Sequence, residues 1–520
     1  MTSSTEISYL DGYLRKIAKG AGTVFIGTGI GLFFAYLGMM TVARLLGPAD
    51  FGLISLASTV AIIASTIVLV GIPGGVVRFV ALYNGKNDPG RVKGVIVSAM
   101  GIVLPLGIIA GILLFLFADL IAVRAFNEPN LTPILKIFSL TVPFYSLFSI
   151  FVHAIGGFQE MKYVVYVRDV FQNGVRLILL IILLLLGYGV YGAVFAYTFA
   201  IIATPFVALY YLNKIFPVFS KKISSISMKR ELFSFSWPLM FAGILGLVMG
   251  WIDTLMIGYF LTAADVGIYR ASLSTAALLM IVPSSLGAIY FPVITEFYSR
   301  GERRNLENTN YAVTKWSLMS VLPLVLLMML FSKQVLYILY GAEFMAGAMV
   351  LSILSVGNLI ISIFGPTNQL ISVIGRTKLI MINTSVGAVL NVILNFLLIP
   401  IYGINGAAIA TGFSLLVVSA LAFIMVRAIT GIQPMRLNYA KIFFAAIISA
   451  VFVYALTRAF FESIPITVLV LMFLLYMGIY FILLLIMRTF EKEDVVIMKA
   501  IEAKSGVKSE WIRNVIGRFL

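Results

Sequence analysis

Two short turns of this sequence are nearly repeated about 215 residues apart. Ala-Asp-Phe-Gly at 49–52 recurs as Ala-Asp-Val-Gly at 264–267, and Tyr-Gly-Val-Tyr-Gly-Ala at 188–193 recurs as Tyr-Gly-Ile-Asn-Gly-Ala at 402–407. Each copy lies between long apolar segments and in the same order. The pattern indicates an internally duplicated membrane protein. Because duplicated helical bundles commonly place a substrate path between their halves, it also favours a transporter.

The composition excludes an ordinary water-soluble protein. Hydrophobic residues make up 61% of the 520 residues, only 11% are charged, and the mean hydropathy is +1.07. A soluble globular protein has about 25% charged residues, so this chain requires lipid as its solvent. The net charge of +16 does not indicate a nucleic-acid partner, because the basic residues lie in short segments beside apolar runs, where anionic lipid headgroups attract them.

The hydropathy pattern predicts an all-α integral membrane protein with about fourteen spans, each roughly 20 residues or slightly longer, as a hydrocarbon core of ~30 Å requires. The expected spans are 21–45, 51–77, 94–118, 132–155, 164–187, 190–212, 234–260, 266–292, 312–332, 345–372, 379–401, 404–427, 440–461 and 465–487. Spans one to six and seven to twelve form the repeat. The predicted fold is two six-helix lobes related by pseudo-two-fold symmetry, with two extra helices.

Five parts follow from this pattern. They are an N-terminal lobe at 1–213, a cytoplasmic basic linker at 214–233, a C-terminal lobe at 234–430, the extra helices at 431–487 and a cytoplasmic basic amphipathic tail at 488–520. No loop is long enough to fold as a separate domain.

The distribution of Lys and Arg predicts the orientation. One alternating set of segments holds nearly all of them, whereas the other holds only Arg124, Lys333 and Arg458, with Arg44 near its border. Basic loops stay in the cytoplasm, so both termini are expected there, in a multi-pass protein of the plasma or inner membrane. Six spans per repeat place both halves in the same orientation, with the symmetry axis along the membrane normal.

The sequence gives little support for an enzymatic activity or for nucleotide binding. The run Gly-Thr-Gly-Ile-Gly at 27–31 lacks the Lys-Ser/Thr ending of a phosphate-binding loop and lies inside a span, where small residues indicate close helix packing. There is no cysteine, and the single histidine, His153, has no acid–base partner at a plausible spacing. We expect no catalytic residue, metal, cofactor or nucleotide.

Two charges lie at membrane depth in the second repeat, Asp253 and Arg270, in adjoining spans and in the outer half of the membrane. A charge at that depth costs about 2.5–3.5 kcal/mol, so each should face a cavity or a partner. One interpretation is a coupling site for H⁺ or Na⁺ near an outer gate. The other is a buried ion pair that only fixes two helices.

Two arginines in the first repeat are candidates for the substrate path. Arg176, halfway along the fifth span, would attract an anionic group such as a pyrophosphate if it faced the cavity. Alternatively, it snorkels toward the cytoplasmic face. Arg78 follows the glycine-rich break at 71–75 in the second span, which is compatible with a hinge or with a binding site.

Amide side chains complete the candidates. Asn391 and Asn395 lie one turn apart in the eleventh span, and Asn368 and Gln369 lie near the cytoplasmic end of the tenth. Amides can bind sugar hydroxyls, but they also form hydrogen bonds between membrane helices. Both interpretations remain open at this point.

Several segments together resemble the oligosaccharide flippase family, in the polysaccharide-transporter branch of the multidrug/oligosaccharidyl-lipid/polysaccharide (MOP) exporter superfamily. The similar segments are Leu-Leu-Gly-Pro-Ala-Asp-Phe-Gly at 45–52, Asp253 with 257–259 and 266–271, and the stretch 391–410. The resemblance extends over nearly the whole chain and includes the number of spans.

The resemblance implies a V-shaped pair of six-helix lobes that work by alternating access. The implied partners are membrane lipids and an isoprenoid-pyrophosphate-linked oligosaccharide, moved from the cytoplasmic to the outer leaflet for surface glycan synthesis. The superfamily commonly couples transport to H⁺ or Na⁺, and a monomer is expected. One alternative is a cation-coupled multidrug antiporter, although the charges at mid-depth are mostly basic. Another is a membrane glycan polymerase or ligase, for which no large outward loop is visible.

Overall fold

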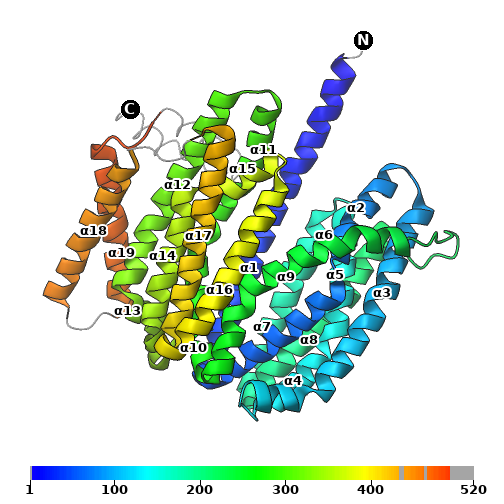
Figure 1. Cartoon of the computed structure of the whole chain (residues 1–520), viewed down its shortest axis with the longest axis horizontal. Coiled ribbons are helices and arrows are strands. Elements are labelled where there is room, and N and C mark those ends of the chain that lie inside the picture. The colour runs from blue at the N-terminus through cyan, green and yellow to red at the C-terminus, as the bar shows by residue number, and fades with distance from the viewer. Residues whose placement is uncertain (1–2, 433–437, 462–464, 492–520) are drawn as a thin grey trace. The chain divides into compact units, whose positions relative to one another are not determined.

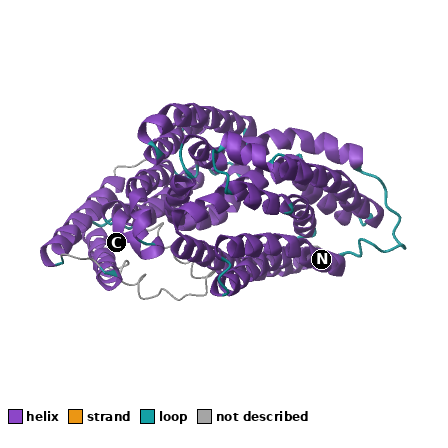
Figure 2. Ribbon diagram, turned by 90° about the horizontal axis from the view of Figure 1, so that it is seen from below, coloured by secondary structure: helices purple, strands orange, loops and turns teal. Residues whose placement is uncertain are grey.

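A computed structural model describes residues 3–432, 438–461 and 465–491, and every regular element in these ranges is a helix (Figures 1 and 2). The predicted all-α class is therefore confirmed. The helices up to the middle of the chain are α1 (Ser3–Leu69), α2 (Ile72–Gly85), α3 (Pro89–Leu116), η1 (Leu120–Ala125), α4 (Leu131–Ser139), α5 (Thr141–Gly157), α6 (Met161–Val165), η2 (Tyr166–Phe171), α7 (Gln172–Leu185), α8 (Gly189–Ile215) and α9 (Lys229–Phe260). They are followed by α10 (Ala263–Ala277), η3 (Leu278–Met280), α11 (Ile281–Ser299), α12 (Arg303–Leu330), α13 (Ser332–Tyr340), η4 (Ala342–Gly347), α14 (Ala348–Phe364), α15 (Thr367–Val373), α16 (Thr377–Tyr402), α17 (Ile404–Thr430), α18 (Asn438–Phe460) and α19 (Ile466–Ile486).

Eleven helical stretches of the described residues are long and apolar enough to cross a membrane, or twelve if α4 and α5, bent by 40°, form one span. The sequence predicts fourteen. The count is lower because Ile26–Leu69 counts as one stretch although it is kinked at Gly47, and because Met161–Leu185 divides into three shorter helices. The protein is a multi-pass membrane protein on either count.

The kink in α1 marks the first repeated turn. Gly47 has φ 82° and ψ 178°, a conformation that a residue with a side chain rarely adopts. Pro48 follows at a first helical position, where its missing N–H leaves no hydrogen bond unmade. The chain therefore ends one span and starts the next within two residues.

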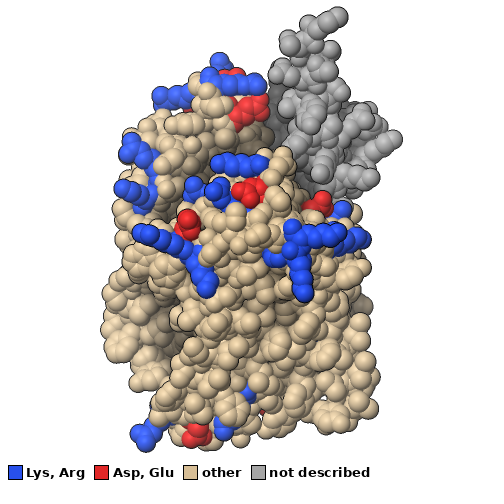
Figure 3. Space-filling view, turned by 90° about the vertical axis from the view of Figure 1, so that its right-hand side faces the viewer, with Lys and Arg blue, Asp and Glu red and all other residues tan. Residues whose placement is uncertain are grey.

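The charged residues are distributed as a membrane protein requires. On the face shown in Figure 3, Lys and Arg gather toward one end, a few charges lie at the opposite end, and a broad band without visible charged residues separates them. Lipid can surround this band without desolvating a charge.

The chain forms two compact units, Met1–Gly267 and Ile268–Leu520. Helix α9, the first span of the second repeat, therefore belongs to the first unit. The boundary lies after α9, whereas the sequence repeat places it in the linker 214–233. The five-part division remains a prediction about the repeat.

The linker before α9 explains this assignment, because it is fastened along α3. The Lys93 ammonium donates to the carbonyl oxygens of Ser220, at 2.7 Å, and of Ile223, at 3.0 Å. The N–H of Met228 donates to Ser98 Oγ at 3.0 Å, and Gly94 leaves no room for a Cβ against the Ile226 backbone. These contacts fix the start of α9 on the first unit.

We predict that Lys93→Met loosens this linker. Hydrogen bonds to a charged group contribute about 1.5–3 kcal/mol each, so even one unreplaced bond should raise linker opening roughly tenfold. Trypsin cleavage after Lys221 and Lys222 should accelerate by that factor. Lys86→Met, a change at an exposed lysine of the same region, is the control and should leave the cleavage rate unchanged. Equal rates in both variants would contradict the proposed role of Lys93.

The two repeated turns meet inside the first unit. A Cβ on Gly52 would overlap the carbonyl oxygen of Ala263, and a Cβ on Gly267 would overlap the carbonyl oxygen of Pro48. Pro48 and Ala263 occupy equivalent positions in the two copies, as do the two glycines. The contact is therefore reciprocal, as expected where two related segments pack about a two-fold axis.

A second glycine contact tests the interpretation of residues 27–31. A Cβ on Gly27 would overlap the Val165 side chain, and a Cβ on Gly31 would lie 2.6 Å from the Cβ of Asp169. Both glycines are buried. The prediction of close helix packing is confirmed, here between α1 and the α6–η2 segment.

Candidate functional site

Arg176 lies on α7, in the first unit, next to α1 and α8. Its guanidinium carbon is 4.7 Å from the centroid of the Tyr197 ring, and its Nε is buried without a hydrogen-bond partner among the described residues. A Cβ on Gly38 of α1 would lie 4.0 Å from this Nε. A guanidinium has five donors, and a cation–π contact, worth about 0.5–2 kcal/mol, satisfies none of them. Arg176 is thus a half-buried cation with no carboxylate partner in the described part of the chain.

Arg176 continues a polar face that begins at Asp169. Asp169, Asn173 and Arg176 follow at spacings of four and three residues, so they share one side of the helix. Thr28 of α1 donates its hydroxyl to Asp169 Oδ2 at 3.0 Å, and Asn173 Nδ2 donates to the Asp169 carbonyl at 2.9 Å. Arg168 contacts both carboxylate oxygens, at 2.8 and 3.2 Å. This face connects α1 and α7 through polar groups.

Sequence reasoning missed Asp169. The residue lies in the π-helical turn η2, and such turns occur frequently at functional sites. In the sequence, Asp169 follows Arg168 near the end of a predicted span, and such a pair is typical of a solvated ion pair. Its spacing to Arg176 was the available signal.

Arg78 is exposed on α2 and lies at a different contact, between α2 and α9. Its guanidinium carbon is 4.3 Å from the centroid of Phe235 and 5.8 Å from that of Phe79. The predicted break precedes it: Val70 and Gly71 have positive φ angles of 47° and 70°, and Gly71 packs against the Ser236 backbone of α9. The described contacts therefore place Arg78 at the α2–α9 packing surface and Arg176 at the α1–α7–α8 surface.

The amides of α16 form hydrogen bonds within this helix and with α17. Asn391 and Asn395 are 1% and 0% exposed. Asn391 Nδ2 donates to Thr411 Oγ1 at 3.3 Å, and Asn395 Nδ2 donates to Asn391 Oδ1 at 3.1 Å. Asn383, two turns earlier, donates to a carbonyl of α17 at 2.9 Å. For Asn391 the geometry favours helix–helix hydrogen bonding. The bond from Asn395 lies within α16, so both interpretations of Asn395 stay open.

We predict that Asn391→Leu lowers stability without changing substrate affinity. The substitution removes two bonds, and hydrogen bonds between membrane helices contribute about 0.6 kcal/mol on average, with a maximum near 1.7. The expected loss is about 1–2 kcal/mol, measured by thermal unfolding in detergent. Loss of glycolipid binding at unchanged stability would instead assign Asn391 to a ligand site.

The second unit offers a more open amide pair on α15. Asn368 is exposed, and Gln369 is half-buried with its Oε1 enclosed and unpartnered among the described residues. A Cβ on Gly287 of α11 would lie 2.7 Å from the Gln369 amide nitrogen. The break at Gly365, with φ 71°, separates α14 from α15 and places both amides at the start of the short helix. Asn368 and Gln369 therefore remain candidates for contact with a polar ligand.

Asp253 and Arg270 fall in different units. Asp253 is 6% exposed on α9, beside the fully buried Thr254, whereas Arg270 is half-buried on α10. The burial of Asp253 fits a carboxylate at membrane depth. Their pairing and their role in ion coupling remain predictions.

Comparison with known proteins gives the family. The model of the family described as "Polysaccharide biosynthesis protein" matches residues 17–298, more than half of the chain, and the MatE family model matches residues 238–397. The match to the first model includes both copies of the first repeated turn.

Individual proteins are also similar to this chain. The uncharacterized membrane protein MJ1068 of Methanocaldococcus jannaschii is 27% identical over 417 residues, which cover 77% of this chain and 82% of the relative. The probable low-salt glycan biosynthesis flippase Agl15 of Haloferax volcanii is 29% identical over 195 residues, 38% of this chain and 41% of the relative. Among solved structures, the lipid II flippase MurJ in an inward closed conformation has a TM-score of 0.73 at 15% identity, covering 89% of this chain and 98% of MurJ.

The structural similarity shows the fold, and the family model shows the membership. The predicted resemblance is therefore confirmed for both. The chain belongs to the polysaccharide biosynthesis protein family and has the fold of the MOP exporter superfamily.

Proposed function

We propose that this protein is a flippase that moves an isoprenoid-pyrophosphate-linked oligosaccharide from the cytoplasmic to the outer leaflet by alternating access. Family membership and the flippase names of relatives support this assignment. A glycan headgroup cannot cross a hydrocarbon core of ~30 Å unaided, because its hydroxyls would lose their hydrogen bonds with water. The protein provides a polar route for the head while the isoprenoid tail stays in lipid.

The observation that carries the proposal is the guanidinium of Arg176. A cation in the interior of a membrane protein requires an anionic or polar partner, and the described part of the chain supplies only the Tyr197 ring and the neighbouring helix surfaces. A diphosphate would supply charge-assisted hydrogen bonds to the unpaired donors. A cationic drug would be repelled by the same group, so the arrangement favours a glycolipid over the substrate of a multidrug antiporter.

The remaining parts of the proposal concern orientation and energy. Both termini lie in the cytoplasm of a cell with the protein in its plasma or inner membrane, and the protein acts without a cofactor as a transporter rather than as an enzyme. Coupling to H⁺ or Na⁺ involves Asp253, whose burial at 6% exposure gives it the environment of a coupling carboxylate.

The test is reconstitution of the purified protein into liposomes that contain a fluorescent isoprenoid-diphosphate oligosaccharide. Leaflet transfer is followed by the access of an added glycan-cleaving enzyme. We expect transfer of the diphosphate lipid and at least roughly tenfold slower transfer of the same glycan on a neutral lipid, because a contact with a charged group contributes about 1.5–3 kcal/mol. Equal transfer of both lipids would contradict the diphosphate assignment, and new glycosidic bonds would indicate a polymerase or ligase.

A further inference from the structure

The second unit contains a fully buried lysine that the proposed function does not use. Lys315, in the fourth turn of α12, is 0% exposed. Its side chain is enclosed by the second unit. A buried ammonium requires a close counter-charge and further hydrogen bonds.

The counter-charge comes from the chain that follows α19. Lys315 Nζ lies 3.8 Å from Glu491 Oε2, and the Glu491 side chain is 28% exposed. Lys315 and Glu491 are 176 positions apart, and α12 belongs to the repeat whereas Glu491 follows the two extra helices. The ion pair therefore joins two parts of the second unit that the sequence repeat separates.

The other oxygen of the same carboxylate is also bound. Asn438 Nδ2, at the start of α18, donates to Glu491 Oε1 at 2.6 Å, and the Tyr311 hydroxyl of α12 donates to it at 3.3 Å. The rings of Tyr311 and Tyr439 stack at 5.4 Å with an interplanar angle of 3°, and the Tyr439 hydroxyl donates to the Tyr311 carbonyl at 3.3 Å. The Glu491 carboxylate thus connects the segment after α19 with α12 and α18.

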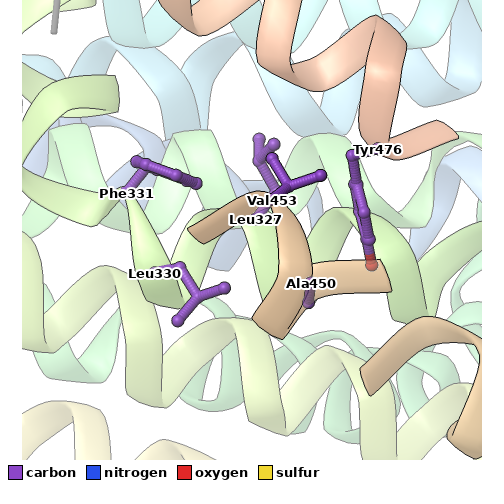
Figure 4. Close-up of a pocket in the computed structure, with 6 residues that line it drawn as sticks. All are labelled: Leu327, Leu330, Phe331, Ala450, Val453 and Tyr476. Atoms are coloured by element: carbon purple, nitrogen blue, oxygen red, sulfur yellow. The ribbon is translucent and has the colours of Figure 1, made fainter. Parts of the chain in front are cut away.

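The rest of the seam between α12 and the extra helices is held differently. Leu318, Leu322, Ile442 and Ala446 form an apolar cluster, and the Tyr480 hydroxyl donates to the Met319 carbonyl at 3.1 Å. Farther along, the seam contains a small pocket between α12, α18 and α19 (Figure 4). Six residues line it: Leu327, Leu330, Phe331, Ala450, Val453 and Tyr476. In lipid, apolar packing of this kind gives little preference for one partner over another, since lipid tails are equally apolar. The charged attachment of the extra helices to α12 lies at the Glu491 end of this seam.

We propose that Lys315 is a positioning residue which, through Glu491, fastens the α18–α19 helix pair to α12. The pair is then a fixed part of the second unit and follows α12 in any conformational change. The inference does not depend on the identity of the transported substrate. It assigns a role to the two helices that have no counterpart in the repeat.

The test uses the absence of native cysteine. Spin labels are attached to Arg304→Cys at the start of α12 and Ala440→Cys at the start of α18, both exposed positions. Distances are measured by double electron–electron resonance on the full chain in lipid nanodiscs. We expect one narrow distribution for the parent protein. In Glu491→Gln or Lys315→Met, a second population should appear that is displaced by about one helical turn or more, ~5 Å.

Double and conservative variants separate positioning from simple loss of fold. Removing one partner of a buried pair leaves an unpaired charge, whereas removing both does not. Lys315→Met with Glu491→Gln therefore removes the fastening without leaving a buried charge, and it should still show the displaced population. Lys315→Arg should retain the narrow distribution. Lys441→Met changes a lysine of α18 whose ammonium donates to a backbone carbonyl, that of Arg488, and it serves as the control. A narrow distribution in both single variants, or in the double variant, would overturn the proposal.

Discussion

Gly52→Val and Gly267→Val should each abolish leaflet transfer and strongly destabilise the protein. At both positions the side chain would meet a backbone carbonyl of the other repeated turn, and not a movable side chain. Overpacking of a core costs about 1–3 kcal/mol where side chains can yield. Here the backbones must separate, so we expect at least about 3 kcal/mol. Thermal unfolding in detergent and transfer in liposomes measure the two effects.

A glycine in open space provides the matched control. Gly85 lies at the end of α2 in the same unit, and a Cβ added there would have no neighbouring atom within 4 Å. Gly85→Val should therefore leave unfolding and transfer close to those of the parent protein. If Gly52→Val and Gly267→Val behaved like this control, the reciprocal contact between the repeated turns would have to be rejected.

Arg176→Ala should reduce transfer of a diphosphate-linked glycan on the order of 100-fold. Two lost charge-assisted bonds of about 1.5 kcal/mol each account for this factor, since 1.4 kcal/mol corresponds to tenfold. Arg176→Lys should lie between the parent protein and the alanine variant, because an ammonium keeps the charge but lacks the planar fork that matches a phosphate. Initial rates in liposomes at fixed protein density measure the effect.

Two further variants define the contribution of the site. Tyr197→Leu removes the ring beneath the guanidinium and should slow transfer by roughly two- to thirtyfold, as a cation–π contact of about 0.5–2 kcal/mol implies. Arg124→Ala, at an exposed arginine of η1, should have no effect. If Arg176→Ala keeps both its stability and its transfer rate, the anionic group binds elsewhere.

The architecture was accessible from the sequence because its signals are local. Span length follows from hydrophobic runs, and the turn at Gly47–Pro48 follows from the conformational preferences of these two residues. The repeat can be recognised directly from the similar amino-acid sequences of its two copies. Close packing at Gly27 and Gly31 was predictable for the same reason, since only small residues allow it.

The site was less accessible because it depends on partners distant in sequence. Whether Asn391 binds a sugar or Thr411 depends on how α17 packs, and the counter-charge of Lys315 is a glutamate 176 positions later. The π-helical turn that carries Asp169 has no reliable sequence pattern. Such residues require coordinates before a role can be assigned to them.

The fastening of α9 to the first unit makes one repeat depend on the other. The surface formed by Gly71, Gly74, Gly75 and Gly94 is occupied by α9 and by the linker before it, both of which are encoded after the first six spans. A protein consisting of one copy alone would leave these glycines uncovered. The first unit therefore depends on residues of the second repeat to cover this surface.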